Sequence, residues 1–324
     1  MLNRVVILDA GYGSYEYEKQ LLTEHGFVLE AFEGGRHDTA GRWAFARGAI
    51  GAFVRWTVLG AAAFDALPSV KYVVRYGVGY DNVDVAAATA RGVLFCNVQG
   101  YANHSVSDHA LALILACVRD LRTGTGRFRQ IYNSPPRPDL PELKDLTLGI
   151  VGLGRIGGIL CMKAKALFRQ VLACDPYIAA ERFPALGAIP VELDTLLTQS
   201  DVVSIHCNLT EETRLMFDKR SLERTRPNAI LVNTARGAIV DEDALLSALD
   251  CGRLYAAGLD VYSEEPPPPN QDALLNHPHV VATGHYAWYS VPAGQELQRR
   301  AARNMLALLQ GHIPEDCLNP EAGS

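Results

Sequence analysis

A glycine-rich turn that follows an apolar run limits the folds open to this chain. Residues 147–151 (TLGIV) continue directly into the pattern G-x-G-x-x-G, formed by Gly152, Gly154 and Gly157, and a helical pattern follows over 159–168. In such a unit the first glycine allows a tight turn, the second lets a pyrophosphate approach the backbone, and the third lets the helix pack on the strand. The segment therefore predicts a strand, a turn and a helix that bind a dinucleotide.

An acid at the end of the next apolar run narrows the choice of dinucleotide. Residues 171–174 (VLAC) predict a second strand, and Asp175 comes directly after it. A carboxylate at this place accepts hydrogen bonds from an adenosine ribose and repels a 2′-phosphate, which favours NAD over NADP. The helix N-terminus offers free N–H groups to the phosphates, and we therefore assign Arg155 and Ile156 to the cofactor as well.

The composition is that of a globular protein. The 324 residues suffice for about two domains, and the formal net charge of −6 argues against direct nucleic-acid binding. The seven cysteines are scattered and form no C-x-x-C pattern, which predicts reduced core residues of a cytoplasmic protein. The apolar stretch 110–118 is too short to span a membrane, and no membrane association is predicted.

Short apolar runs alternate with helical patterns along the chain, which is typical of parallel α/β structure. In the N-terminal part we expect strands at 5–8, 50–54, 71–75 and 93–97. A long bridging helix is predicted over about 105–121. Its start, Ser105-x-x-Asp108, has the pattern of a capping box, and its apolar face consists of Ala110, Ile114, Cys117 and Leu121. A proline-rich segment, 134–138, predicts a rigid loop before the dinucleotide unit.

Polar residues follow four further apolar runs, at the point where each predicted strand ends. The runs 202–205, 229–233, 256–259 and 280–282 lead respectively to His206, Thr234-Ala235-Arg236, Asp260 and His285. Glu265 comes five residues after Asp260. Because ligands of open α/β sheets bind at the carboxyl ends of the strands, these side chains should line one edge. An arginine can grip a carboxylate, and a histidine beside an acid can donate the proton that a carbonyl oxygen needs when hydride arrives.

The same residues carry a family resemblance. The segments 151–157, 232–237 (VNTARG), 260–266 (DVYSEEP) and His285 resemble the D-isomer-specific 2-hydroxyacid dehydrogenases, and 75–84 (RYGVGYDNVD) resembles the substrate-domain loop of that family. The resemblance implies two Rossmann-like lobes with doubly wound parallel sheets, the cofactor lobe being inserted into the substrate lobe. The expected domains are 1–102 with 288–324 for the substrate and 103–287 for NAD.

The resemblance also implies roles for individual residues. Arg236 is expected to anchor the substrate carboxylate, His285 to act as acid and base, and Glu265 to keep that histidine protonated. The reaction expected is the NAD-dependent interconversion of a 2-oxo acid and a D-2-hydroxy acid, catalysed by a homodimer. The cofactor set is completed by His206, Thr213, Thr234, Ala235 and Asp260.

One branch of the family is more similar than the rest. The segment 285–290 (HYAWYS) resembles the C-terminal-binding-protein corepressors and their bacterial relatives. In that branch residues at the positions of Arg75 and Trp288 face the substrate. The family resemblance as a whole implies that the backbone near Val78 and Gly79 helps to hold the substrate carboxylate. The chain departs from the family at Gly284, where proline is usual, and at Asn208, where proline or glycine is common.

Two other functions stay open at this point. One is an NAD(H)-sensing binding protein like the corepressors, in which a partner surface is regulated. The other is a dehydrogenase of a phosphonate or another oxyanion. No metal is predicted, because His277 and His279 have no accompanying set of ligands with metal spacing.

Overall fold

The computed structural model describes residues 3–122 and 140–323. They form two compact units: unit 1 is Met1–Tyr101 with Ser290–Ser324, and unit 2 is Ala102–Tyr289. The proline-rich segment predicted at 134–138 lies outside the described residues.

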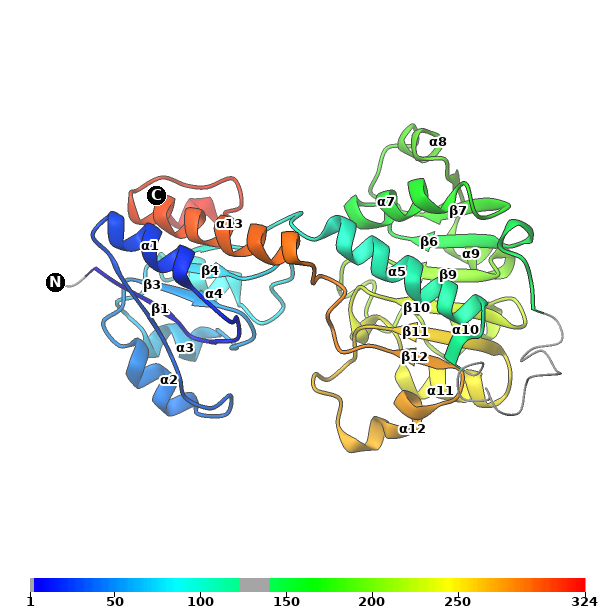
Figure 1. The fold of residues 1–324 in the computed structure, drawn as a ribbon, viewed down its shortest axis with the longest axis horizontal. Helices are drawn as coiled ribbons and strands as arrows, with labels where there is room; N and C mark the ends of the chain where they lie inside the picture. The colour runs from blue at the N-terminus through cyan, green and yellow to red at the C-terminus, as the bar shows by residue number, and fades with distance from the viewer. Residues whose placement is uncertain (1–2, 123–139, 324) are drawn as a thin grey trace. The chain divides into compact units, whose positions relative to one another are not determined.

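Unit 1 contains a five-stranded parallel sheet (Figure 1). Its strand order is β2-β1-β3-β4-β5. The strands are β1 (Arg4–Ile7), β2 (Val28–Ala31), β3 (Gly51–Val54), β4 (Tyr72–Arg75) and β5 (Leu94–Cys96). The helices are α1 (Glu16–Glu24), α2 (Thr39–Ala46), α3 (Ala61–Ala66), α4 (Val85–Thr89) and, from the C-terminal part of the chain, α13 (Val291–Leu309). A short 3₁₀ turn, η4 (Pro320–Gly323), lies beside β5 and α4.

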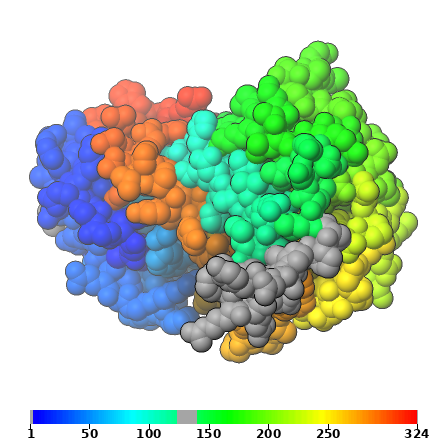
Figure 2. Space-filling view, turned by 45° about the vertical axis from the view of Figure 1, so that its right-hand side comes forward, coloured from blue at the N-terminus to red at the C-terminus, as the bar shows by residue number. Residues whose placement is uncertain are grey.

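Burial explains this arrangement. Every residue of β3 is buried, as expected of a central strand in a parallel sheet covered on both faces, whereas the edge strand β2 is partly exposed. On one face α1 and α13 lie side by side (Figures 1 and 2), so the C-terminal segment completes a core that the N-terminal residues begin.

Unit 2 contains a seven-stranded parallel sheet of order β12-β11-β10-β9-β6-β7-β8. Its strands are β6 (Thr147–Val151), β7 (Gln170–Cys174), β8 (Ile189–Pro190), β9 (Val202–Ile205), β10 (Ala229–Asn233), β11 (Leu254–Leu259) and β12 (Val280–Ala282). Its helices are α5 (Asn103–Val118), α7 (Arg155–Ala164), α8 (Arg182–Leu186), α9 (Leu193–Gln199), α10 (Lys219–Arg224), α11 (Glu242–Asp250) and α12 (Asp272–Asn276). Three 3₁₀ turns accompany them: η1 (Leu143–Asp145), η2 (Gly237–Ile239) and η3 (Pro269–Gln271).

Alternate residues of each strand in unit 2 enter two separate cores. In β10, Ile230 and Val232 pack with α5 and α7, whereas Ala229 and Leu231 pack with α9, α10 and α11. The helices α5 and α7 lie side by side (Figures 1 and 2). The sheet is doubly wound, because the chain leaves β6 toward β7 and later returns to its other side at β9. The adjacent ends of β6 and β9 form the switch point at which such sheets bind ligands. The predicted fold class, two parallel doubly wound α/β lobes, is confirmed.

Local details of the prediction were wrong. The capping box at Ser105 does not form: α5 begins at Asn103, and Asp108 pairs instead with Lys163 at 2.6 Å. Leu121 lies beyond the end of α5 and is 54% exposed, so it is not part of the helix face. The helix after the glycine turn begins at Arg155 and ends at Ala164. Strands β2 and β8 were not predicted, because both are short edge strands with exposed residues.

Candidate active site

The glycine turn of unit 2 is shaped by contacts that leave no room for a side chain. Gly152 has φ +91°, and a Cβ on it would lie 2.5 Å from the backbone nitrogen of Cys207. A Cβ on Gly157 would lie 2.1 Å from the carbonyl oxygen of Gly152. Gly154, by contrast, faces open space where a phosphate could approach. The turn therefore has room for a pyrophosphate, and α7 begins directly after Gly154 with Arg155 and Ile156, so its free backbone N–H groups lie at the same turn.

Asp175 closes this turn from the end of β7. Its Oδ2 accepts a hydrogen bond from the backbone N–H of Leu153 at 2.8 Å, and its Oδ1 accepts one from Tyr177 at 3.0 Å. Asp175 thus holds the glycine turn directly, and its role toward a ribose stays a prediction.

His206 comes directly after β9, at the switch point. Its Nε2 lies 2.8 Å from the hydroxyl of Ser204, and burial lowers the pKa of His206 to about 4. The imidazole is neutral at physiological pH, so His206 is unsuited to donate a proton there. Thr213 lies in the following loop, where its hydroxyl donates to the carbonyl of Asn208 at 2.6 Å and fixes the loop conformation.

Arg236 is presented by a turn after β10 that other residues define. The side chain of Asn233 donates to the carbonyl of Arg236 at 2.9 Å and accepts from the N–H of Ala235 at 3.0 Å. A Cβ on Gly237 would lie 1.8 Å from the backbone carbon of Tyr262. The hydroxyl of Thr234 is buried and has no hydrogen-bond partner among the described residues. That unsatisfied group is available to a ligand at this edge.

His285 and Glu265, which are far apart in the sequence, form a hydrogen-bonded ion pair. His285 Nδ1 lies 2.5 Å from Glu265 Oε2. Burial raises the pKa of Glu265, but the hydrogen bond and charge of His285, the N–H of Tyr262 and the charge of Arg236 outweigh burial and hold that pKa below its usual value. An ionised carboxylate only accepts hydrogen bonds, so Nδ1 carries a proton and Nε2 is the nitrogen open to a substrate.

Asp260 positions the segment that carries His285. Its buried carboxylate accepts hydrogen bonds from the hydroxyl of Thr283 at 2.6 Å and from the N–H of Ala287 at 2.9 Å, and His109 Nε2 lies 3.5 Å away. The N–H of His285 donates to the carbonyl of Asp260 at 2.7 Å, and His285 adopts a left-handed backbone with φ +52°. Such a conformation is uncommon for a residue other than glycine and persists only where the surroundings fix it.

Two residues were missed by the sequence reasoning. Thr283 hydrogen-bonds to Asp260, and it also contacts His109 of α5 at 2.9 Å. Asn233 shapes the arginine turn. Both follow or end a strand on the edge already singled out, and this position is the signal that could have found them. Trp288 donates from Nε1 to the carbonyl of His285 at 3.1 Å, so it supports the histidine backbone directly.

The substrate residues predicted in unit 1 lie in the loop after β4. Val78 is 41% exposed, and its carbonyl accepts a hydrogen bond from the side chain of Asn97 at 2.7 Å. Gly77 has φ +134°, and a Cβ there would lie 1.9 Å from the Arg75 guanidinium. Arg75 ends β4, and Val78 and Gly79 follow it in the loop at the carboxyl edge of the sheet in unit 1.

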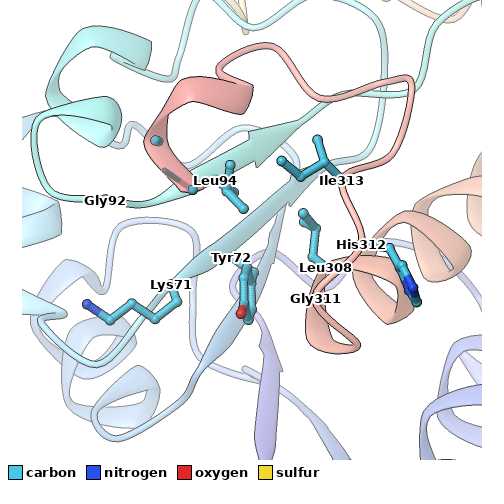
Figure 3. A pocket seen from close by; sticks show the side chains of 10 residues that line it. Lys71, Tyr72, Gly92, Leu94, Leu308, Gly311, His312 and Ile313 are labelled. Carbon is cyan, nitrogen blue, oxygen red and sulfur yellow. The ribbon is translucent and has the colours of Figure 1, made fainter.

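A hollow of about 330 Å³ in unit 1 does not include the predicted substrate residues Arg75, Val78 and Gly79 (Figure 3). Lys71, Tyr72 and Leu94 line it near the start of β4 and β5, which is the opposite end of the strands from Arg75.

Among the described residues no cluster of three or more His, Cys, Asp or Glu side chains could hold a metal ion. None of the described helices combines the length and the apolar character needed to cross a membrane.

Comparison with known proteins identifies the class to which this architecture belongs. Residues 111–287 match the family described as D-isomer specific 2-hydroxyacid dehydrogenase, NAD binding domain. The chain is 38% identical over 266 residues to a glyoxylate reductase of Korarchaeum cryptofilum, covering 81% of this chain and 80% of that protein. It is 38% identical over 267 residues to a D-3-phosphoglycerate dehydrogenase of Mycobacterium leprae, covering 82% of this chain but about half the length of that relative.

Solved structures agree with this classification. The TT0316 protein from Thermus thermophilus has a TM-score of 0.87 at 32% identity, covering 97% of this chain and 99% of that one. A glyoxylate reductase from Paecilomyes thermophila has a TM-score of 0.84 at 28% identity, with 99% of both chains covered. The chain is a nucleotide-binding α/β protein, and it belongs to the D-isomer specific 2-hydroxyacid dehydrogenase family. The predicted family and the predicted NAD cofactor are confirmed, whereas the resemblance to the corepressor branch stays a prediction.

Proposed function

We propose that this chain is an NAD-dependent oxidoreductase that interconverts a 2-oxo acid and a D-2-hydroxy acid. The observation that carries the proposal is the His285–Glu265 pair, joined at 2.5 Å. It lies at the same sheet edge of unit 2 as Arg236, whose charge acts on Glu265. A proton donor, its carboxylate partner and a carboxylate anchor are the three groups that reduction of a 2-oxo acid requires.

The glycine turn and the residues around it would hold the cofactor. Gly152, Gly154 and Gly157 make room for the pyrophosphate, and Arg155 and Ile156 begin the helix that faces it. When bound, the nicotinamide supplies or accepts the hydride. The remaining cofactor contacts are assigned to Asp175, His206, Thr213, Thr234, Ala235 and Asp260. The unpartnered hydroxyl of Thr234 and the neutral imidazole of His206 support these assignments.

Arg236 is proposed to bind the substrate carboxylate with its planar guanidinium. The proposal assigns further substrate contacts to Arg75, Val78, Gly79 and Trp288. It gives substrate binding to 1–102 with 288–324 and NAD binding to 103–287.

His285 carries the proton of the reaction. In the reducing direction its Nε2 donates to the carbonyl oxygen of the substrate, and in the oxidising direction it takes the proton of the hydroxyl group. Glu265 favours the imidazolium because an ionised carboxylate stabilises a neighbouring cation. The left-handed backbone at His285, fixed by Asp260, keeps the ring in one place for this transfer.

The test is NADH oxidation against a panel of 2-oxo acids, from glyoxylate to branched, aromatic and phosphorylated ones. At least one acid should be reduced, and every product with a stereocentre at C2 should have the D configuration; glycolate, the product from glyoxylate, has none. The His285→Ala variant keeps the NAD site and should bind NADH. It should reduce every 2-oxo acid on the panel far more slowly than the parent protein does. If the parent protein binds NADH but reduces no 2-oxo acid on the panel, the proposal is wrong.

The names of the relatives narrow the choice of candidate substrates. Those matched over most of their length are named glyoxylate reductases, and those matched over half are named D-3-phosphoglycerate dehydrogenases. We therefore propose a small 2-oxo acid and place glyoxylate first on the panel. The homodimer and the cytoplasmic location stay predictions, and sedimentation velocity tests the first of them.

A further inference from the structure

Two cysteines that are far apart in the sequence lie opposite each other in unit 1. Cys96 ends strand β5, and Cys317 lies in the segment after α13 that runs antiparallel to it. The residues on either side make the backbone hydrogen bonds: the N–H of Leu318 donates to Phe95 at 2.9 Å, and the N–H of Asn97 donates to Asp316 at 3.3 Å.

This pattern makes Cys96 and Cys317 a non-hydrogen-bonded pair of an antiparallel ladder. In such a pair the Cα atoms are roughly 4.5 Å apart and the side chains lie on the same face. Disulfides span Cα separations of about 4.4–6.8 Å. The pair therefore has the spacing of a cross-strand disulfide without movement of the backbone.

We propose that Cys96 and Cys317 form a reversible redox pair, oxidised to a disulfide by hydrogen peroxide and reduced again by a thiol. The pair goes beyond the proposed dehydrogenase reaction and depends on none of its residues. Its location, on β5 and the C-terminal segment, is also remote in sequence from the glycine turn and the His285 loop.

The two thiols differ in a way that assigns each a role. Cys317 is partly exposed and Cys96 is fully buried. The hydrogen bond between the two thiols lowers the pKa of the more exposed Cys317 and raises the pKa of the buried Cys96. Cys317 is thus the thiolate that meets an oxidant, and Cys96 is the thiol that resolves the product.

The chemistry balances in two steps. The Cys317 thiolate attacks one oxygen of peroxide, the O–O bond breaks, and hydroxide leaves and takes up a proton, which gives a sulfenic acid and water. The sulfur of Cys96 then attacks the sulfenic sulfur; the S–S bond forms, the S–O bond breaks, and water leaves with the proton of Cys96. Two thiols lose two electrons in total, and peroxide is reduced to two molecules of water.

The surroundings hold the two segments in register. Asp316, beside Cys317, accepts two hydrogen bonds from Arg300 at 2.7 and 2.9 Å and a third from Asn304 at 3.0 Å. Asn319 accepts from the N–H of Phe95 at 2.7 Å and donates to the carbonyl of Val93 at 2.9 Å. In Figure 3 Ile313 of the same C-terminal segment lies beside Leu94 of β5. A segment fastened at both ends keeps the thiols together in the reduced protein.

The test treats the intact protein with a small excess of hydrogen peroxide, alkylates all remaining thiols in denaturant, and maps the peptides by mass spectrometry. Trypsin and chymotrypsin together cut at Tyr101, which separates Cys96 from Cys117. The parent should lose two hydrogen atoms and yield a peptide that links Cys96 to Cys317, and dithiothreitol should reverse both changes. Cys251→Ser, which removes the exposed cysteine of unit 2, should behave as the parent.

Two single variants complete the design. In Cys96→Ser the oxidation should stop at a sulfenic acid on Cys317, which dimedone traps. In Cys317→Ser, Cys96 should remain reduced under the same treatment. Either of two results in the parent overturns the proposal: Cys96 remains fully alkylated while Cys317 advances to the sulfinic acid, or either cysteine is found linked to a different partner.

Discussion

The two sheets are built alike, but the loops at their carboxyl ends are held by different means. In unit 2 the glycine turn and the arginine turn are shaped by backbone packed against backbone, at Gly152, Gly157 and Gly237. In unit 1 the loop after β3 is folded around a single buried side chain: Asp9 accepts hydrogen bonds from the backbone N–H groups of Arg55, Trp56 and Thr57 at 2.8, 3.2 and 3.1 Å.

The loop after β4 in unit 1 follows the second pattern. The hydroxyl of Tyr76 donates to the buried carboxyl of Glu18 at 3.0 Å, and Gln298 of α13 donates to the same oxygen at 2.9 Å. A close backbone approach demands glycine at one position and so leaves a local mark in the sequence. A loop held by distant side chains leaves none, which is why the contacts of Asp9 and Glu18 in unit 1 could not be predicted from local sequence.

The largest effect on catalysis is expected for a substitution of His285 in unit 2. His285→Ala removes the proposed proton donor and should lower kcat for oxo-acid reduction by roughly 10²–10⁴-fold. NADH affinity should stay within a few-fold, because the glycine turn is untouched. Steady-state kinetics and fluorescence titration of NADH measure the two quantities separately.

The matched control for His285→Ala is His206→Ala. Since His206 is neutral, His206→Ala should weaken NADH binding. The pH dependence of the reduction rate should stay as in the parent. Near-normal turnover in His285→Ala, together with a collapse in His206→Ala, would transfer the acid role to His206.

The next effect tests the arginine turn. Arg236→Lys keeps the charge but loses the two-pronged geometry, and kcat/KM should fall by about 3 kcal/mol in activation free energy. Arg226→Lys, a change to a half-exposed arginine paired with Asp201 at 3.3 Å, should leave kcat/KM unaltered. A lysine variant at 236 that reduces 2-oxo acids as well as the parent would show that the turn presents something other than the anchor.

The same contrast explains what the sequence could and could not predict. The strands of unit 2 other than β8, the glycine turn and the pair at Glu265 and His285 follow from local spacing and from the family resemblance. The role of Asp260 in fixing the His285 loop was not foreseen, because its partners at Thr283 and Ala287 come from a later loop. The capping box at Ser105 was wrong for a related reason: Lys163, on another helix, binds Asp108. Tertiary partners decide such contacts, and periodicity carries no information about them.

A smaller effect is expected where unit 1 depends on a distant side chain. Tyr76→Phe leaves the buried carboxyl of Glu18 with one donor fewer, and the free energy of unfolding should fall by about 1–3 kcal/mol. NADH affinity should not change, because Tyr76 belongs to unit 1. Urea unfolding followed by circular dichroism measures the loss, and Tyr80→Phe, at an exposed tyrosine, is the control. Equal stabilities of the two variants would contradict the idea that unit 1 depends on such contacts.

Cofactor choice provides a test of Asp175 in which charge and hydrogen bonding are separated. Asp175→Asn keeps an acceptor for the N–H of Leu153 but removes the charge that repels a 2′-phosphate. The preference for NADH over NADPH should narrow by on the order of tenfold, which is about 1.4 kcal/mol. Asp175→Ala should narrow it as well and should also weaken NADH binding, because the glycine turn loses its hydrogen bonds. Fluorescence titration with both cofactors gives the ratio; an unchanged preference in Asp175→Asn would mean that the carboxylate does not face the ribose.

The smallest effect is expected for Glu265→Gln, which keeps the shape of the His285 partner but removes its charge. The pKa of Glu265 is held below its usual value, so the carboxylate is ionised across the neutral range and favours the imidazolium of His285. Without that charge the neutral imidazole is reached at lower pH. The alkaline limb of the reduction profile should therefore move toward lower pH, and the acid limb of the oxidation profile should move with it. Because the side chains of Glu265 and His285 are 34% and 42% exposed, solvent screens the pair, and the movement of both limbs should be small. Glu264→Gln, one residue earlier in the same loop, should leave both limbs in place. If the limbs of the pH–rate profiles move equally in the two variants, the cause is a general loss of negative charge. If they stay in place in both variants, Glu265 has no part in the proton transfer.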